Sequence, residues 1–187
     1  MTDLEPLREE VRKRLNPKRV PHVNGCEKEA VKLARRWGAD EEKAAVAGIL
    51  HDVTKALKGD AQVRFVAENG IECDPQLLSE PKLLHAVTGA YVAKTDFAQP
   101  EDICSAIRWH TTGRAGMTLL EKIIYLADYI EETRDFPGVD KLRSTAYKDI
   151  DEAMALGLKM SIEDIRSRGT IPYIETVRAY EYYRRED

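Results

Sequence analysis

Apolar residues recur at intervals of three and four along most of the chain, and no segment alternates convincingly with a period of two. Spacing of this kind gathers apolar side chains on one face of an α-helix. Glycines and prolines divide the pattern into segments, and we find no internal repeat and no low-complexity stretch. The sequence therefore predicts an all-α protein, a bundle of helices packed through their apolar faces.

Capping residues give approximate limits for several helices. Gly38 is typical of a helix end, Asp40 of a helix start, and Thr118 with Glu121 forms a capping-box pattern. After residue 138 we expect two or three helices, the longest from about 150 to 168. The helices expected before that point cover approximately residues 4–15, 21–37, 40–52, 60–70, 82–94, 100–110 and 118–132.

Three further boundaries depend on single residues. We expect Asp60 to cap a helix and Pro100 to be the first helical residue of another. Pro75 and Pro81 are expected to break the chain ahead of the helix from about residue 82 to 94. The segment from Thr111 to Gly116 holds two threonines, two glycines and an arginine, so its composition predicts a loop.

Length and charge limit the function classes. A chain of 187 residues with 43% hydrophobic residues fits one domain with one core, expected over residues 1–187. The net charge is -4 and the isoelectric point is near 5.7. A nucleic-acid partner is therefore not expected, because binding to a phosphate backbone favours a basic surface.

Cysteine usage and hydropathy indicate the compartment. The three cysteines are odd in number and lie in helix-like apolar segments, which is typical of reduced thiols in the cytoplasm. Residues 1–10 are acidic and polar, unlike a signal peptide. The longest apolar run, Ala44 to Leu50, is too short to cross a bilayer. We expect a cytoplasmic protein with no membrane partner.

All four histidines of the chain occur where a metal site could use them, together with two aspartates. Imidazole and carboxylate ligands suit iron, manganese, cobalt, nickel or zinc, and six ligands exceed what one tetrahedral ion needs. Two divalent ions are therefore the working hypothesis. For a single histidine, an ordinary half-buried side chain would be the better explanation. The six candidate ligands are His22, His51, Asp52, His85, His110 and Asp128.

Helical spacing turns these side chains inward. His110 shares a face with Ile103 and Ile107, and Asp128 shares one with Ile124. A carboxylate on such a face is unfavourable unless it is paired or bound to a cation, and an ion pair with arginine or lysine is the alternative for Asp128. Asp52 follows His51 directly, so it is the candidate bridge between two ions.

Lys55 lies four residues after His51 and three after Asp52. One helical turn would place its ammonium group at the edge of the metal site. There it could neutralise a phosphate oxygen or hold the attacking water. The alternative is a solvated lysine at a helix end.

Five motifs in order carry a resemblance to a known family. They are His22, then HDVTK at 51–55, LLHAVTGA at 83–90, WHTTGR at 109–114, and LADYIE at 126–131 followed by TRDFPG. Each is weak alone, but the succession resembles the HD superfamily of metal-dependent phosphohydrolases, which are all-helical enzymes. Within it, the chain looks like the YqeK-type symmetrical bis(5'-nucleosyl)-tetraphosphatases. No G-Y-P motif follows His110, which disfavours the cyclic-dinucleotide branch.

The resemblance implies cleavage of diadenosine tetraphosphate, or a related dinucleoside polyphosphate, into two ADP- or GDP-type products at a binuclear iron centre. Manganese, cobalt and nickel are alternatives. It implies that one ion binds His22, His51, Asp52 and Asp128, and that the second binds Asp52, His85 and His110. Asp52 and Lys55 would be catalytic, with Lys55 also binding substrate. Weaker candidates for polyphosphate contact are Thr111, Thr112, Arg114 and Arg134.

Two ions about 4 Å apart could clamp phosphate oxygens and lower the pKa of a shared water, which would attack phosphorus with ADP as leaving group. No serine or cysteine nucleophile is required. The competing functions are another HD-type nucleotide phosphohydrolase, a di-iron oxygenase and a non-catalytic nucleotide sensor.

The segment from Pro172 to Arg185 places Tyr173, Val177 and Tyr180 on one helix face. We interpret this face as a cover for the core. The alternative is a partner surface, and the resemblance makes a homodimer the partner to consider.

Overall fold

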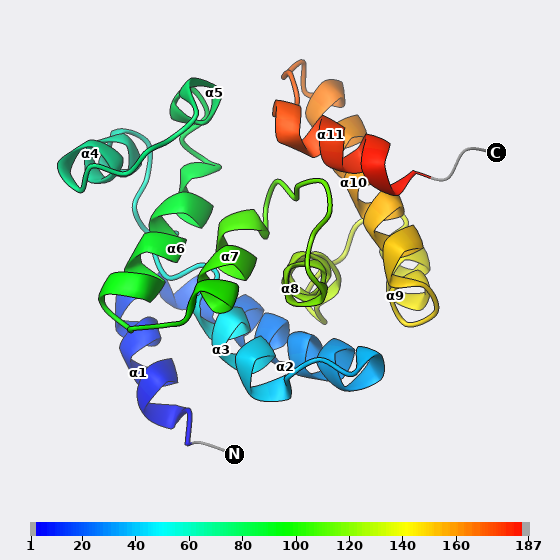
Figure 1. Ribbon diagram of the computed structural model, residues 1–187, viewed down its shortest axis with the longest axis horizontal. Coiled ribbons are helices and arrows are strands. Elements are labelled where there is room, and N and C mark those ends of the chain that lie inside the picture. The colour runs from blue at the N-terminus through cyan, green and yellow to red at the C-terminus, as the bar shows by residue number, and fades with distance from the viewer. Residues whose placement is uncertain (1–2, 185–187) are drawn as a thin grey trace.

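The computed structural model describes residues 3–184, and these contain helices, turns and loops but no strand. The predicted all-α class is therefore confirmed for this part of the chain. No helix there combines the length and the hydropathy that crossing a membrane would need. In chain order (Figure 1) the elements are α1 (Glu5–Arg14), the 3-10 turn η1 (Pro17–Arg19), α2 (Val20–Trp37), α3 (Glu41–Leu50), α4 (Asp60–Glu68), α5 (Pro75–Leu78), α6 (Leu84–Thr95), α7 (Glu101–Trp109), α8 (Leu119–Ile130), α9 (Val139–Ala146), α10 (Ile150–Ser167) and α11 (Ile174–Tyr183).

The strongest capping signals of the sequence are confirmed. Gly38 ends α2 in the left-handed region, with φ of 75°. The Asp40 carboxylate accepts hydrogen bonds from the backbone N–H groups of Glu42 and Lys43. At the start of α8, both reciprocal hydrogen bonds of the Thr118–Glu121 capping box are present. These local hydrogen bonds satisfy backbone donors that have no partner within the helix.

Three predicted boundaries are wrong. The N-cap of α4 is Gly59, and Asp60 is the first residue of the helix. The backbone carbonyls of Lys58 and Gly59 accept hydrogen bonds from the N–H groups of the first turn, so no side-chain cap is used. Pro100 is the cap of α7 rather than its first residue. Pro75 begins the short helix α5 instead of breaking the chain, since proline is well tolerated in the first helical turn.

The core lies where α2, α3, α7 and α8 pack against one another, with α10 and α11 covering one side and α4 to α6 the other (Figure 1). Leu33, Ile49, Ile107 and Ile124 are among its fully buried side chains. A Cβ added to Gly48 in α3 would lie 2.8 Å from Cα of Glu27 in α2. The absence of a side chain at this position therefore lets α2 and α3 approach closely, less than one turn before His51.

The C-terminal helix α11 covers the core, as its tyrosine pattern predicts. Tyr173 and Tyr183 are buried, and Tyr180 packs against the core. The Tyr183 hydroxyl accepts a hydrogen bond of 2.7 Å from the backbone N–H of Met117. Arg185, the last residue of the predicted segment, lies outside the described residues. A single domain over 1–187 and a homodimer stay predictions.

Candidate metal centre

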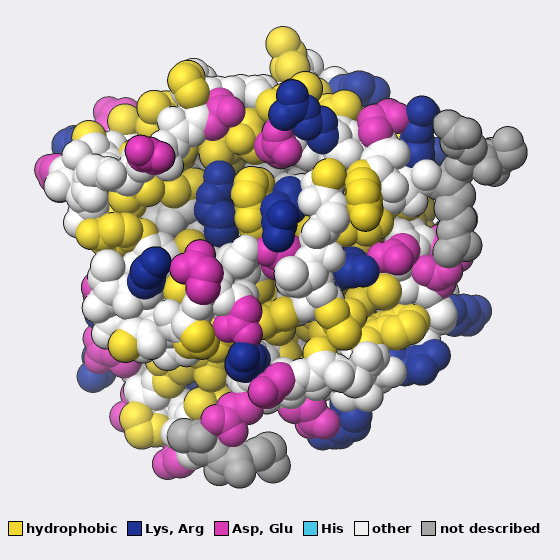
Figure 2. Space-filling model, in the orientation of Figure 1, with side chains coloured by type: hydrophobic (Ala, Val, Ile, Leu, Met, Phe, Trp, Pro, Cys, Tyr) yellow, Lys and Arg dark blue, Asp and Glu magenta, His cyan; other side chains and the backbone are white. Residues whose placement is uncertain are grey.

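The six candidate ligands come from separate elements and meet in the interior. His22 is in the first turn of α2, His51 and His110 are the C-caps of α3 and α7, and His85 and Asp128 lie on α6 and α8. No histidine surface is visible on the face shown in Figure 2, which agrees with the burial of all four rings. The predicted gathering of these side chains is therefore present in the structure.

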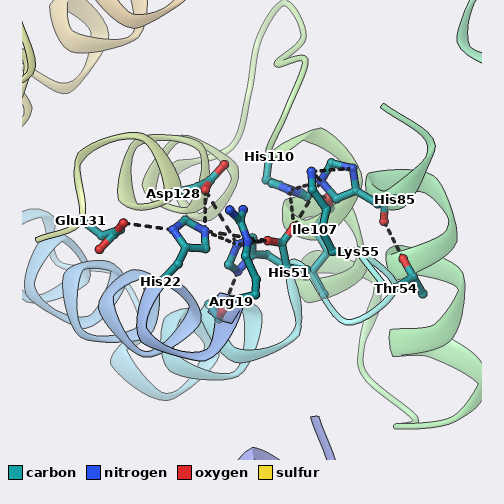
Figure 3. A network of polar contacts seen from close by, with 12 residues as sticks. Arg19, His22, His51, Thr54, Lys55, His85, Ile107, His110, Asp128 and Glu131 are labelled. Carbon is teal, nitrogen blue, oxygen red and sulfur yellow. Dashed lines mark hydrogen bonds and ion pairs between the residues drawn. The ribbon is translucent and has the colours of Figure 1, made fainter. Parts of the chain in front are cut away.

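The histidines form two pairs, each with its Nε2 atoms facing (Figure 3). The Nε2 atoms of His22 and His51 are 3.2 Å apart, and those of His85 and His110 are 3.1 Å apart. Asp52 completes both groups, giving His22–His51–Asp52 and Asp52–His85–His110 with potential ligand atoms within 4.8 Å of one another.

The outer nitrogen of each ring fixes its tautomer. Nδ1 of His22 lies 3.0 Å from a carboxylate oxygen of Glu131, and the other three Nδ1 atoms lie 2.6–2.7 Å from backbone carbonyl oxygens. These acceptors call for a proton on Nδ1, so Nε2 is the ring nitrogen that remains to coordinate an ion. For His51 and His110 the acceptor is the carbonyl three residues earlier, in the last helical turn, where carbonyls lack helical partners. The three carbonyls belong to Gly48, Lys82 and Ile107.

This arrangement fits a cation within each pair. Two Nε2 atoms that face each other at about hydrogen-bond distance repel unless a proton or a metal ion lies between them, and a metal ion could bind both. Burial, His85 and His51 keep the pKa of His110 well below its ordinary value, so this ring remains neutral and able to coordinate. Mixed imidazole and carboxylate donors suit divalent transition metals.

Asp52 lies between the two pairs in a bridging orientation. Its Oδ2 is 3.5 Å from Nε2 of His51 and 3.8 Å from that of His22, whereas its Oδ1 is 3.3 Å from Nε2 of His85. Oδ1 is buried and has no hydrogen-bond partner among residues 3–184, which is unfavourable unless a cation meets it. Burial opposes the charge, but His51 and His85 hold the pKa of Asp52 well below its usual value.

Asp128 lies both beside a candidate metal-binding histidine and in an ion pair with an arginine, the two roles that the sequence analysis considered. Its Oδ1 lies 3.0 Å from Nε2 of His22 and 2.6 Å from the guanidinium of Arg134. Arg134 also donates to the backbone carbonyl of Asp128. The aspartate is thus a candidate ligand held in place by an ion pair, and Arg134 lies at the edge of the site.

Lys55 lies beside the second pair of histidines. Its Nζ is 3.1 Å from Nε2 of His85, and burial lowers its pKa. Lys55, His85, Thr111 and Thr112 line a cavity of about 310 Å³. The buried hydroxyl of Thr111 has no hydrogen-bond partner within the described part of the chain, whereas the Thr112 hydroxyl donates to the carbonyl of Gly113.

Arg114, the remaining candidate, points elsewhere. Its guanidinium lies 3.0 Å from the fully buried carboxylate of Glu121, and it is not among the residues lining that cavity. Glu121 also accepts a hydrogen bond from Ser105 and closes the capping box of α8. A contact between Arg114 and substrate therefore stays a prediction, while its contact with α8 is observed.

Two residues that the sequence analysis did not identify contact the candidate ligands. Arg19 donates from Nε to Asp52 Oδ2 at 2.5 Å, and the fully buried Glu131 accepts from His22. Helical spacing could have indicated both, because Arg19 precedes His22 by three residues and Glu131 follows Asp128 by three. Their roles could not be separated from surface charge without knowing which helices pack together.

A buried polar network holds the turn that carries His51, Asp52 and Lys55. Gln62 of α4, which is 1% exposed, donates to the backbone carbonyls of Thr54 and Leu57. Its side-chain carbonyl accepts from Thr88 at 2.7 Å, and the Thr54 hydroxyl donates to the carbonyl of His85. The network therefore joins this turn to α4 and α6.

Comparisons with known proteins agree with this geometry. The HD domain profile matches residues 19–133. A symmetrical bis(5'-nucleosyl)-tetraphosphatase of Bacillus subtilis (strain 168) is 38% identical over 173 residues, covering 92% of each chain. One from Staphylococcus aureus (strain NCTC 8325 / PS 47) is 31% identical, covering 99% of this chain and 96% of that protein.

A solved structure shares the fold. The crystal structure of a predicted HD superfamily hydrolase involved in NAD metabolism from Clostridium acetobutylicum has a TM-score of 0.92 and 36% identity, covering 98% of this chain and 97% of that one. The resemblance inferred from the five motifs is thus confirmed over nearly the whole length. The chain belongs to the HD domain family.

Proposed function

We propose that this protein is a symmetrical bis(5'-nucleosyl)-tetraphosphatase, which hydrolyses diadenosine tetraphosphate and related dinucleoside tetraphosphates to two nucleoside diphosphates. The observation that carries the proposal is Asp52, whose two oxygens face two different histidine pairs beside Lys55. The names of relatives that align over most of their length support the choice of substrate.

Two divalent transition-metal ions, which we take to be iron, fit the six ligands; one would bind His22, His51, Asp52 and Asp128, and the other Asp52, His85 and His110. When bound, such ions polarise phosphate oxygens and lower the pKa of a bound water, which supplies a nucleophile at neutral pH. Manganese, cobalt and nickel have the same ligand preferences.

The remaining side chains would bind and orient the polyphosphate. The Lys55 ammonium and the Arg134 guanidinium offer positive charge at the edge of the ligands. The Thr111 hydroxyl, which has no partner among the described residues, is a donor in the adjoining cavity. Water is the nucleophile that fits this site. The thiol of Cys26, next to His51, is fully buried, and burial raises its pKa, so it is not activated for attack.

Basic side chains in the cavity favour phosphate chemistry over oxygen activation. Lys55, Lys82 and Arg168 all line it. We further propose that the protein acts in the cytoplasm, which its three free cysteines support.

The test is a substrate panel assayed with iron or manganese and analysed by chromatography. It contains diadenosine tetraphosphate, nucleoside monophosphates and guanosine alarmones. We expect ADP as the single product from the first compound. AMP together with ATP would contradict a symmetrical cut, and no turnover with any metal would favour a nucleotide sensor.

Metal content checks the site independently of turnover. We expect two ions per chain in protein purified without chelators and reconstituted with iron. Asp52→Asn, which keeps the shape of the side chain, should lose more metal than any single histidine change, because Asp52 is placed between both pairs. A stoichiometry of one or less in the wild type would contradict the binuclear site.

A further inference from the structure

Two cavities meet at Lys55. The first is the 310 Å³ cavity described above, here named the inner cavity, whose lining also includes Ile165, Thr170 and Tyr173. The second, named the basic groove, has a volume of about 580 Å³. It is lined by Leu15, Asn16, Lys18, Arg19, Lys55, Ala56 and Lys58.

The basic groove has a charge opposite to that of the whole protein. Four of its seven lining residues are lysine or arginine and none is acidic, although the net charge of the chain is -4. Lys18 and Lys58 are exposed, and neither forms an ion pair with any residue between 3 and 184. A concave surface lined by one sign of charge concentrates ligands of the opposite sign.

The groove begins at the metal centre and its walls are held in place. Arg19 contacts Asp52, and Lys55 contacts His85, so one cation of the groove touches each side of the ligand cluster. On one wall, Asn16 accepts a hydrogen bond from the backbone N–H of Lys18 and so caps η1. On the other, Gln62 donates to the carbonyl of Leu57, the residue before Lys58.

A symmetrical cut requires room for one nucleoside diphosphate on each side of the ligands. The inner cavity combines apolar, aromatic and hydroxyl groups, which suit a nucleoside, with the cations Lys55, Lys82 and Arg168, which suit its phosphates. The basic groove offers mainly positive charge. Resting on the proposed function, we propose that the basic groove is the second half-site, which binds one nucleoside diphosphate half of the substrate through its phosphates. Lys18 and Lys58 then determine affinity for this half without touching the ligand cluster.

The test compares two double variants of the metal-reconstituted protein with equal change in net charge. Lys18→Glu with Lys58→Glu reverses the charge of two of the four cations that line the groove. Lys141→Glu with Lys148→Glu is the matched control, because both of these lysines are exposed and line neither cavity. For the groove variant we expect KM for diadenosine tetraphosphate to rise about tenfold or more, with kcat within about twofold. For the control variant, both constants should stay within about twofold of the wild type.

Equilibrium dialysis with ADP provides a measurement that does not depend on turnover. We expect two ADP per chain for the wild type and the control, and one for the groove variant. Unchanged KM and two bound ADP in the groove variant would overturn the second half-site. If the charge reversals lower the melting temperature, Lys18→Ala with Lys58→Ala replaces them. If the wild type does not hydrolyse diadenosine tetraphosphate, the proposed function fails, and ADP dialysis alone decides whether the groove binds a nucleoside diphosphate.

Discussion

Replacing Glu131 by glutamine should weaken metal binding without removing a metal ligand. The Glu131 carboxylate accepts three hydrogen bonds, one from Nδ1 of His22 and two from Thr133, through its backbone N–H and its hydroxyl. Glutamine keeps the volume but has one acceptor oxygen instead of two. At least one of these donors then faces an amide NH₂ group, and even with its oxygen toward His22 the neutral amide is a weaker acceptor than the carboxylate, so the ring is held less firmly.

The size of the expected loss of metal affinity follows from the contact of Glu131 with Nδ1 of His22, the ring nitrogen that faces away from the metal site. Losing a carboxylate that orients a metal-binding histidine reduces metal affinity by about 10- to 100-fold, or about 1.4–2.8 kcal/mol. Titration with iron or manganese against a competing chelator measures this change. Glu132→Gln is the matched control, because this neighbouring carboxylate is exposed and pairs with the exposed Lys28.

Gly25→Ala tests the same contact by a different route. A Cβ at position 25 would overlap Oε2 of Glu131, so the carboxylate would have to move away. We expect a similar loss of metal affinity, with the four histidines and two aspartates intact. Metal affinity of Glu131→Gln within about threefold of the wild type, in a folded protein, would refute the orienting role. A loss in Glu131→Gln but not in Gly25→Ala would refute the steric argument.

Three other perturbations have expected outcomes. Lys55→Ala should retain both metals and its melting temperature while kcat/KM falls about 10²-fold or more, and near-wild-type turnover would assign phosphate binding to Arg134 or Thr111 instead. Arg114→Ala should lower the free energy of unfolding by about 1–3 kcal/mol with little change in kcat/KM, because it leaves the buried carboxylate of Glu121 with fewer partners. A fall in kcat/KM with unchanged stability would show a substrate contact instead. Removing metal with a chelator should lower the melting temperature, since the paired imidazoles and Asp52 Oδ1 would lose their cations; an unchanged melting curve would mean that the native fold does not bind metal.

The sequence predicted those helix boundaries that depend on hydrogen bonds between residues close together in the chain. The caps at Asp40 and Thr118 were predictable because their partners lie two or three residues away. Boundaries failed where the backbone itself supplied the acceptors, as before Asp60, or where a proline fitted the first turn of a short helix, as at Pro75. Before Asp60 no side chain carried the information, whereas at Pro75 the preceding Asp74 did, because its carboxylate accepts a hydrogen bond from the backbone N–H of Gln76.

The six candidate ligands were predictable because each is polar and expensive to bury on an apolar helix face. Glu131 and Arg19 were not, because each is explained only by a partner on another element. Glu131 reaches His22 from 109 positions away, and Arg19 reaches Asp52 from 33. Which of many charged residues meets a ligand depends on how the helices cross, and periodicity does not determine this.

Glycines within helices show how packing produces the site. A helix-interior glycine is less favourable than alanine by about 1 kcal/mol, so its presence requires a compensating contact. Gly48 lets α3 approach α2, which brings His51 to His22, and Gly25 leaves room for the carboxylate that orients His22. A Cβ at Gly89 of α6 would lie 3.4 Å from the backbone carbonyl oxygen of His51. The small residues thus set the distances between helices, and these distances determine whether the imidazoles can share ions.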